Sequence, residues 1–256
     1  MSYTATTSGL PCWYELGTSD MDGAAAFYEG VLGWTVVSAG MPGMDYRLGN
    51  ASDGVGVAGF MDAEGQPSAW RFYLEVADCD AAAATVTETG GMVVAGPDDI
   101  PGTGRFAVAV DPQGCVFGLL APLPMEEAPS VGAYATTVNG HGAWHELSAP
   151  DPAAALEFYA NLVGWTKSVT MDMGSDGVYQ LFQANGNDIG GMMTPMPGQN
   201  PGWLAYFTVE STAAAAARIT EAGGSVIHGP VDVPGGSFIA IAVDPQGASF
   251  GVTGPA

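Results

Sequence analysis

Apolar and polar positions along the chain follow two periods, one typical of helices and one typical of strands. Ala24, Phe27, Tyr28 and Val31 recur at helical spacing behind the cap signal Ser19-Asp20, which predicts a helix running through residue 30. Short apolar stretches bounded by turn residues flank this helix and predict strands. The predicted strands cover residues 12–17, 46–48, 54–61, 71–76, 92–94, 106–110 and 116–120.

A second helix is predicted in the same half, from a cap at Asp78 to a stop at Gly90-Gly91. The other half of the chain shows the same order of elements. Its first helix begins with Asp151 as N-cap and Pro152 at the first helical position. The remaining predicted elements are a helix over 212–222 and strands over 179–182, 188–193, 225–227, 239–243 and 249–253.

The order of elements returns because the sequence itself repeats. The segment WYEL at residue 13 returns as WHEL at residue 144, and WRFYLEV at residue 70 returns as WLAYFTV at residue 203. The turn DPQG occurs at residue 111 and again at residue 244. A period this long indicates duplicated domains rather than a solenoid of small units. We therefore predict a first domain over 1–122, a linker over 123–138 and a second domain over 139–256.

Composition narrows the choice of partners. The 256 residues carry 27 Asp and Glu against five Lys and Arg, a net charge of −22, which argues against nucleic acid and anionic membranes as partners. The hydrophobic content of 47% is sufficient for folded cores. Three scattered cysteines, Cys12, Cys79 and Cys115, suggest neither a zinc cluster nor a disulfide framework. We see no signal peptide and no transmembrane segment, so we expect a cytoplasmic monomer or homodimer.

The repeated motifs carry a resemblance. The chain resembles the vicinal oxygen chelate superfamily in four motifs. These are a W-x-E-L strand, a helix that ends in F-Y and G-W, a W-x-x-Y strand and a final D-P-Q-G-x-x-F-G segment. This superfamily includes glyoxalases, extradiol dioxygenases and bleomycin-resistance proteins. The closest likeness is to its tandem-domain actinobacterial branch, which includes glyoxalase-like hydroxylases and a mycobacterial antigen. The resemblance implies an α+β fold of two tandem domains, each of two βαβββ modules that form a cupped mixed or antiparallel sheet.

The resemblance also implies three metal-ligand positions in each copy, and this chain lacks ligands there. The positions hold Trp13, Arg71 and Gly118 in the first copy and Trp144, Leu204 and Gly251 in the second. Indole, guanidinium, leucine and glycine side chains do not supply the lone pairs that divalent ions require. We therefore expect no metal and no other cofactor.

A different metal site, from His145, Glu146 and His228 in the second copy, is a minor alternative. Strand side chains alternate between two faces, so His145 should point away from Trp144 and Glu146. A site shared by these residues would need a bulge or a shift in register.

The same alternation groups the candidate site residues. We expect each cup to carry a tryptophan wall, a tyrosine hydroxyl and a carboxylate, because indoles bind flat ligands and a carboxylate beside an indole loses hydration. The proposed catalytic residues are Glu15, Glu146, Tyr73, Tyr206 and Arg71. The proposed ligand-binding residues are Trp13, Trp144, Trp70, Trp203, Tyr46, Tyr179 and Met192.

Structural roles remain open for these residues. The aromatic side chains would also serve as core in cups without metal, and the repeated Glu would also hold a neighbouring group in place. Arg71 either stabilises an enolate or phenolate or pairs with Glu15 or Glu75. Because Leu204 occupies the equivalent position, the two cups differ, and which of them is functional is undecided.

Three functions follow from these observations. The leading hypothesis is a metal-independent enzyme of secondary metabolism, such as antibiotic biosynthesis. It would bind a hydrophobic aromatic, polyketide-like molecule and transform it by acid–base chemistry, as in a cyclisation, isomerisation, dehydration or rearrangement. The first alternative is a non-catalytic protein that sequesters an antibiotic or metabolite. The second alternative is a metal-dependent glyoxalase-like lyase or dioxygenase with displaced ligands.

Overall fold

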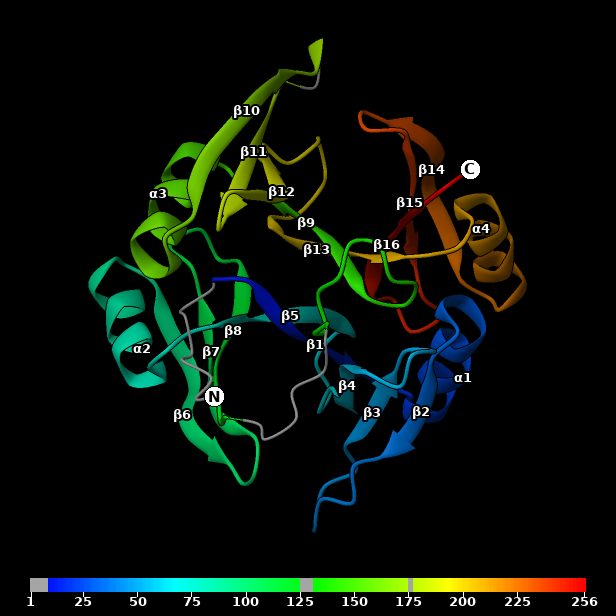
Figure 1. Cartoon of the computed structure of the whole chain (residues 1–256), viewed down its shortest axis with the longest axis horizontal. Coiled ribbons are helices and arrows are strands. Elements are labelled where there is room, and N and C mark those ends of the chain that lie inside the picture. The colour runs from blue at the N-terminus through cyan, green and yellow to red at the C-terminus, as the bar shows by residue number, and fades with distance from the viewer. Residues whose placement is uncertain (1–8, 125–130, 175–176) are drawn as a thin grey trace. The chain divides into compact units, whose positions relative to one another are not determined.

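The computed structural model describes residues 9–124, 131–174 and 177–256, and within them the repeated order of elements is confirmed (Figure 1). The first copy contains β1 (Pro11–Thr18), α1 (Met21–Leu32), β2 (Thr35–Ser38), β3 (Arg47–Asn50), β4 (Gly56–Asp62), β5 (Ala69–Glu75), α2 (Cys79–Glu88), β6 (Met92–Ile100), β7 (Gly104–Val110) and β8 (Val116–Pro122). The second copy contains β9 (Gly142–Ser148), α3 (Pro152–Val163), β10 (Thr166–Asp172), β11 (Val178–Ala184), β12 (Asn187–Met193), β13 (Gly202–Thr208), α4 (Thr212–Glu221), β14 (Ser225–Val233), β15 (Ser237–Val243) and β16 (Ser249–Gly254).

All four predicted helices are present, and their predicted caps at Asp20, Asp78 and Asp151 accept backbone N–H bonds. The sequence missed β2 and β10, whose residues are mostly exposed and so lack the alternation that marks a half-buried strand. The sequence also predicted a turn at each Gly-Pro pair, whereas β6 and β14 continue through these residues. Both strands pass through this point with a shifted register against their neighbours, β7 and β15.

Each module combines a parallel pair with antiparallel neighbours. In the first module, β1 runs parallel to β4, with Glu15 opposite Gly59, while β2, β3 and β4 are antiparallel. The strand orders are β2-β3-β4-β1 and β5-β8-β7-β6 in the first copy, and β10-β11-β12-β9 and β13-β16-β15-β14 in the second. The α+β class with two βαβββ modules per copy is therefore confirmed.

The compact units of the chain do not coincide with its two copies. Among the described residues, one unit consists of those within Met1–Cys12, Phe72–Ala128 and His145–Trp203, and the other of those within Trp13–Arg71, Pro129–Trp144 and Leu204–Ala256. Each unit thus joins a module of one copy to a module of the other, and α2 packs on α3 in one unit as α1 packs on α4 in the other (Figure 1). The domain boundaries at 122 and 139 remain predictions, and residues 125–130 of the predicted linker lie outside the described residues.

A buried chain of hydrogen bonds joins the two modules of the second unit. The indole of Trp70 donates to the hydroxyl of Tyr28 (2.8 Å), which donates to Oδ2 of Asp244 (3.0 Å). The other oxygen of Asp244 accepts the backbone N–H groups of Gln246 and Ala248. Burial raises the pKa of Asp244 and raises the pKa of Tyr28 well above its usual range, so Tyr28 stays a proton donor.

The first unit contains the same chain with the roles of the copies exchanged. Trp203 donates to Tyr159 (3.0 Å), and Tyr159 donates to Asp111 (3.2 Å). Oδ1 of Asp111 accepts from the backbone of Gln113 and Cys115. The repeated D-P-Q-G turn therefore presents a carboxylate to the first helix of the other copy. This contact explains why the sequence repeats Tyr and Asp together.

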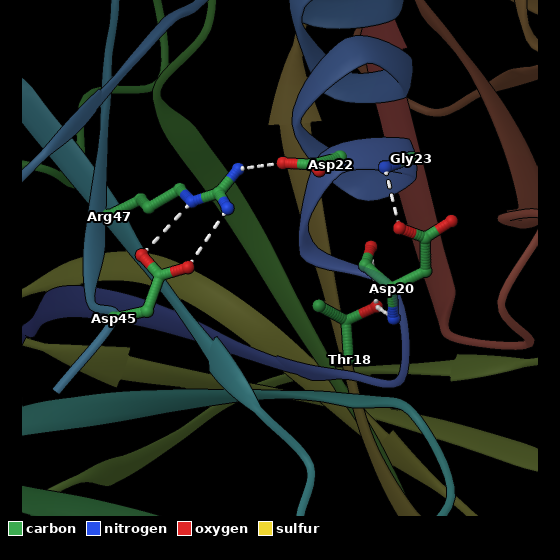
Figure 2. A network of polar contacts seen from close by, with 6 residues as sticks. All are labelled: Thr18, Asp20, Asp22, Gly23, Asp45 and Arg47. Atoms are coloured by element: carbon green, nitrogen blue, oxygen red, sulfur yellow. Dashed lines mark hydrogen bonds and ion pairs between the residues drawn. The ribbon is translucent and has the colours of Figure 1, made fainter.

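Charged side chains fix the N-terminal turn of α1 (Figure 2). Asp20 caps the helix by accepting the N–H of Gly23 at 2.9 Å. Arg47 at the start of β3 donates to Asp22 in the first helical turn (2.7 Å) and to both oxygens of Asp45. These carboxylates lie where the helix dipole favours negative charge, and the guanidinium ties the helix to the sheet. Among the described residues, no helix is both long and apolar enough to cross a bilayer.

We predict that Tyr28→Phe destabilises the protein by about 2 kcal/mol, because a buried carboxylate oxygen and an indole N–H lose their partner. Tyr159→Phe is the matched change in the other unit and should cost a similar amount. Chemical denaturation followed by circular dichroism measures both free energies of unfolding. Unchanged midpoints for both variants would show that these chains do not stabilise the units.

Candidate functional site

Three side chains of the first module form a hydrogen-bonded row on one face of its sheet. Trp13 and Glu15 alternate with Tyr14 and Leu16 along β1, and Tyr46 immediately precedes β3. The indole of Trp13 donates to the hydroxyl of Tyr46 at 3.1 Å, and this hydroxyl donates to Oε2 of Glu15 at 3.0 Å. Gly59 lies opposite Glu15, and a Cβ there would overlap the ring of Tyr46. The glycine therefore makes room for the tyrosine.

Arg71 completes this group from β5. Its Nε donates to Oε1 of Glu15 at 2.7 Å, its Nη2 forms an ion pair with the same oxygen, and Nη2 also lies 3.2 Å from Sδ of Met61. Glu15 is 7% exposed, whereas the side chain of Arg71 is 26% exposed. We call Trp13, Glu15, Tyr46, Met61 and Arg71 the first site. It unites a buried carboxylate, a guanidinium and a phenol.

The second copy repeats part of this arrangement in the other compact unit. The hydroxyl of Tyr179 donates to Oε2 of Glu146 at 3.1 Å, and its ring covers Gly191 as the ring of Tyr46 covers Gly59. We call Glu146, Tyr179 and Gly191 the second site. By the sequence repeat, Leu204 is the equivalent of Arg71, so this copy has no guanidinium at that position.

The tyrosines that we expected to bind the two Glu side chains lie on β5 and β13. Tyr73 and Tyr206 are buried, and their rings cover Gly118 and Gly251 on the neighbouring strands β8 and β16. A Cβ at either glycine would overlap the tyrosine ring. The hydrogen bonds to Glu15 and Glu146 described above come from Tyr46 and Tyr179, so a catalytic role for Tyr73 or Tyr206 remains a proposal.

These glycines bear on the metal that the resemblance implies. At the position where that resemblance expects a carboxylate ligand, Gly118 and Gly251 leave space that a tyrosine ring fills. Trp13 and Arg71 occupy the other two ligand positions of the first copy, and neither offers a lone pair to a cation. Over residues 9–124, 131–174 and 177–256, no three His, Cys, Asp or Glu side chains lie close enough to hold a metal ion. The side chains at these positions therefore do not fit a divalent metal.

The alternative metal site is not assembled either. His145 points away from the face of Glu146, as strand alternation predicted. It is fully buried, its Nδ1 lies 3.1 Å from the carbonyl oxygen of Ile189, and its ring packs on Phe72 at 4.7 Å between centroids. His228 is an exposed residue of β14. Within the described part of the chain, these histidines belong to no cluster of metal ligands.

Three other residues that we expected in a ligand site make contacts outside the first and second sites. Trp70 and Trp203 turn their indoles toward Tyr28 and Tyr159 of the helices, and alternation along β5 puts Trp70 on the opposite face from Arg71. Met192 is fully buried and pairs with Leu147 across β12 and β9, one residue beyond the pair of Gly191 and Glu146. The ligand-binding roles of Trp70, Trp203 and Met192 remain proposals. Trp144 is a half-buried residue of β9, and its ligand-binding role remains a proposal.

Sequence reasoning treated Tyr46 and Tyr179 as ligand contacts and did not identify them as hydrogen-bond donors to the carboxylates. The signal was in the repeat, because each tyrosine follows its Glu at nearly the same interval, 31 and 33 residues. Each copy also has a glycine opposite the Glu on the parallel strand. A glycine facing a repeated Tyr and Glu indicates a ring that needs space beside a carboxylate.

The fold and these sites define a protein of two glyoxalase-type domains. The model of the glyoxalase/bleomycin resistance protein/dioxygenase superfamily matches residues 12–119 and 140–252. The chain belongs to this superfamily.

Relatives and solved structures extend the comparison. CFP32 of Mycobacterium tuberculosis (strain CDC 1551 / Oshkosh), a protein named for the glyoxylases, is 35% identical over 255 residues, which cover 97% of this chain and 95% of CFP32. The anthracycline biosynthesis protein DauV of Streptomyces sp. (strain C5) is 32% identical over 275 residues, which cover 97% of this chain and 94% of DauV. The Mn(II)-bound glyoxalase of Novosphingobium aromaticivorans has the same fold, with a TM-score of 0.69 at 19% identity over 96% of this chain and 82% of that one.

The buried His145 predicts a dependence of stability on pH. Burial lowers its pKa from the ordinary 6.5 to about 4. Between these values the unfolded chain binds a proton that the folded protein does not, so the free energy of unfolding falls as the pH falls. The loss approaches a magnitude on the order of 3 kcal/mol by pH 4.

The variant His145→Gln keeps a donor for the carbonyl of Ile189 and cannot titrate in this range. It should lose less stability than the wild type between pH 7 and pH 4 in denaturation series, whereas the exposed control His228→Gln should follow the wild type. Parallel pH curves for wild type and His145→Gln would contradict the assignment.

Proposed function

We propose that this protein binds a hydrophobic aromatic, polyketide-like small molecule and transforms it by metal-independent acid–base chemistry in secondary metabolism. Such chemistry includes cyclisation, isomerisation, dehydration and rearrangement. The observation that carries the proposal is the first site, where a buried carboxylate lies within hydrogen-bond reach of a phenol and a guanidinium. These are groups that remove a proton, hold a carboxylate in position and stabilise an oxyanion.

The roles follow from the geometry of each group. Glu15 or Glu146 is the general base or acid, and Tyr46 or Tyr179 orients it by donating to Oε2. Arg71 stabilises negative charge that develops on a substrate oxygen. The half-buried indoles of Trp13 and Trp144 provide walls for a flat ligand.

The named relatives support the class of ligand. DauV and the protein DnrV of Streptomyces peucetius, which is 32% identical, are both named as anthracycline biosynthesis proteins. Their likeness extends over nearly the whole chain, so the proposed substrate is an aromatic product of such a pathway. The non-ligating side chains at the family's metal positions support a reaction without a metal.

A non-catalytic binding protein is the second candidate. The observation that favours it is the ion pair itself, because two N–H groups of Arg71 already engage Oε1 of Glu15. In that case the pair would stabilise the fold, and Trp13 would only enclose the ligand. An enzyme requires proton transfer to the bound molecule, whereas a binding protein requires only its retention.

We propose the cytoplasm as the setting, with the protein a monomer or homodimer. The support comes from the cysteines, since Cys12, Cys79 and Cys115 are all free thiols. Free thiols are typical of a reducing compartment. Burial raises the pKa of Cys79 to about 11 and that of Cys115 to about 12, which makes both thiols poor nucleophiles.

Ligand binding should survive removal of metal. The ligand 1,8-dihydroxyanthraquinone should quench the tryptophan fluorescence of the protein. We expect this titration to give the same Kd for protein dialysed against EDTA as for untreated protein. Trp13→Ala should weaken binding about fivefold, because an aromatic contact contributes about 1 kcal/mol beyond its buried area, and Trp13→Phe should retain most of the affinity. Stoichiometric metal in the purified protein, with binding lost after EDTA, would contradict a metal-independent function.

A further inference from the structure

The first site is electrically neutral in a strongly acidic protein. The paired charges of Arg71 and Glu15 cancel, and the carboxylate is buried while the side chain of Arg71 is 26% exposed. The chain as a whole carries a net charge of −22, which repels anions. A carboxylate ligand would meet this field and would also compete with Glu15 for the guanidinium. A neutral ligand avoids both costs, so the charge of the site selects for uncharged molecules.

Arg71 is distinguished from the other arginines by what surrounds it. The side chains of Arg47 and Arg105 are 22% and 35% exposed, and each forms ion pairs with two exposed aspartates. Arg218 donates to the carbonyl of Val31 at the end of α1. Arg71 alone among the described arginines forms an ion pair with a buried carboxylate, that of Glu15, which shares the hydroxyl of Tyr46 with the indole of Trp13. It is therefore the cation placed to act on a ligand that stacks on Trp13.

The adjacent donor and base define the chemistry of the ligand. A guanidinium donates to a carbonyl oxygen, and a carboxylate beside it accepts the proton from the neighbouring carbon. We infer that the substrate of the first site is a neutral, enolisable ketone carried on a flat apolar ring system, and that the reaction begins at this site rather than at the second. This inference rests on the proposed acid–base function and assigns its substrate class and location.

The proposed step balances without a further reactant. Glu15 takes the proton from the carbon next to the ketone, and the electrons of that C–H bond form a carbon–carbon double bond. The electrons of the carbonyl π bond move to the oxygen, whose negative charge Arg71 stabilises. Return of the proton from Glu15 to the same carbon restores the ketone, and its return to a conjugated carbon gives an isomer.

Tyr46 acts through Glu15 as a positioning residue. Its hydroxyl binds Oε2 and itself accepts the indole N–H of Trp13, so the carboxylate is held from one side by the phenol and from the other by Arg71. The second site shares the phenol and the carboxylate, but its copy carries Leu204 where the first carries Arg71. A developing oxyanion therefore has a guanidinium only in the first copy. This difference is why we assign the reaction to Glu15.

The inference is tested with 2-tetralone, a neutral bicyclic ketone, and the full-length protein in D2O. Proton NMR follows exchange of the hydrogens next to the carbonyl, at a pD where uncatalysed exchange is slow. We expect the protein to accelerate exchange and Glu15→Gln to lower the rate at saturating probe by about 100-fold, the size of a lost general base. Glu146→Gln should cause a much smaller loss, and the exposed control Glu157→Gln should match the wild type.

Arg71 is tested separately from folding. Arg71→Leu copies the second site and should lower the exchange rate at saturating probe more than it raises the half-saturating concentration, with partial recovery in Arg71→Lys. Glu15→Gln leaves Arg71 without its carboxylate, so the double variant Glu15→Gln/Arg71→Leu provides a site without an unpaired charge. Its exchange rate should be as low as that of Glu15→Gln, and its denaturation midpoint should equal that of the wild type.

The outcomes separate the two claims. Loss of exchange in Glu146→Gln with retention in Glu15→Gln overturns the assignment to the first site and leaves the acid–base function standing. Tighter binding of the anion 2-naphthoate than of 2-tetralone, measured by tryptophan fluorescence, overturns the neutral substrate class. No acceleration by the wild type overturns both the inference and the catalytic function.

Discussion

The hydrogen bond from a helix tyrosine to the aspartate of a distant turn is the contact on which this fold depends. Tyr28 reaches Asp244 and Tyr159 reaches Asp111, so each copy supplies the carboxylate that completes the other. Each aspartate also fixes its own turn through two backbone N–H groups. Because an unpaired buried carboxylate is costly, these bonds favour pairing of modules from different copies. Each compact unit therefore combines modules from both copies of the repeat, and neither copy forms a compact unit by itself.

The chain keeps the architecture of its family, and at the positions where the resemblance expects metal ligands it carries side chains that do not ligate a metal. At Gly118 and Gly251, where the resemblance expects a carboxylate ligand, a tyrosine ring takes the space in both copies. Elsewhere in the two copies, the rings of Tyr46 and Tyr179 cover Gly59 and Gly191. Each tyrosine donates to the Glu that lies opposite its glycine on the parallel strand. The polar chemistry of these sheets therefore comes from phenol and carboxylate. Arg71 adds a guanidinium in one copy only, which makes the copies unequal.

The sequence predicted the helices and the faces of the strands well, because capping residues and side-chain alternation are local properties. Alternation put Glu15 and Arg71 on one face, where they form the ion pair that was one alternative for Arg71, and it turned His145 away. It failed where the deciding contact was distant in sequence: the pairing of Tyr46 with Glu15, the engagement of Trp70 by Tyr28, and the exchange of modules between copies. The edge strands β2 and β10 were missed because their exposed residues show no period.

The central claim is that a guanidinium and a carboxylate, in place of a metal, hold and activate a neutral ligand beside Trp13. A crystal structure of the protein with 2-tetralone bound tests it most directly. The account predicts the ketone oxygen within hydrogen-bond distance of Arg71, the adjacent carbon next to Glu15 and the ring plane on the indole of Trp13. A ketone oxygen bound to a metal ion, or a ligand bound away from Arg71 and Glu15, would contradict it.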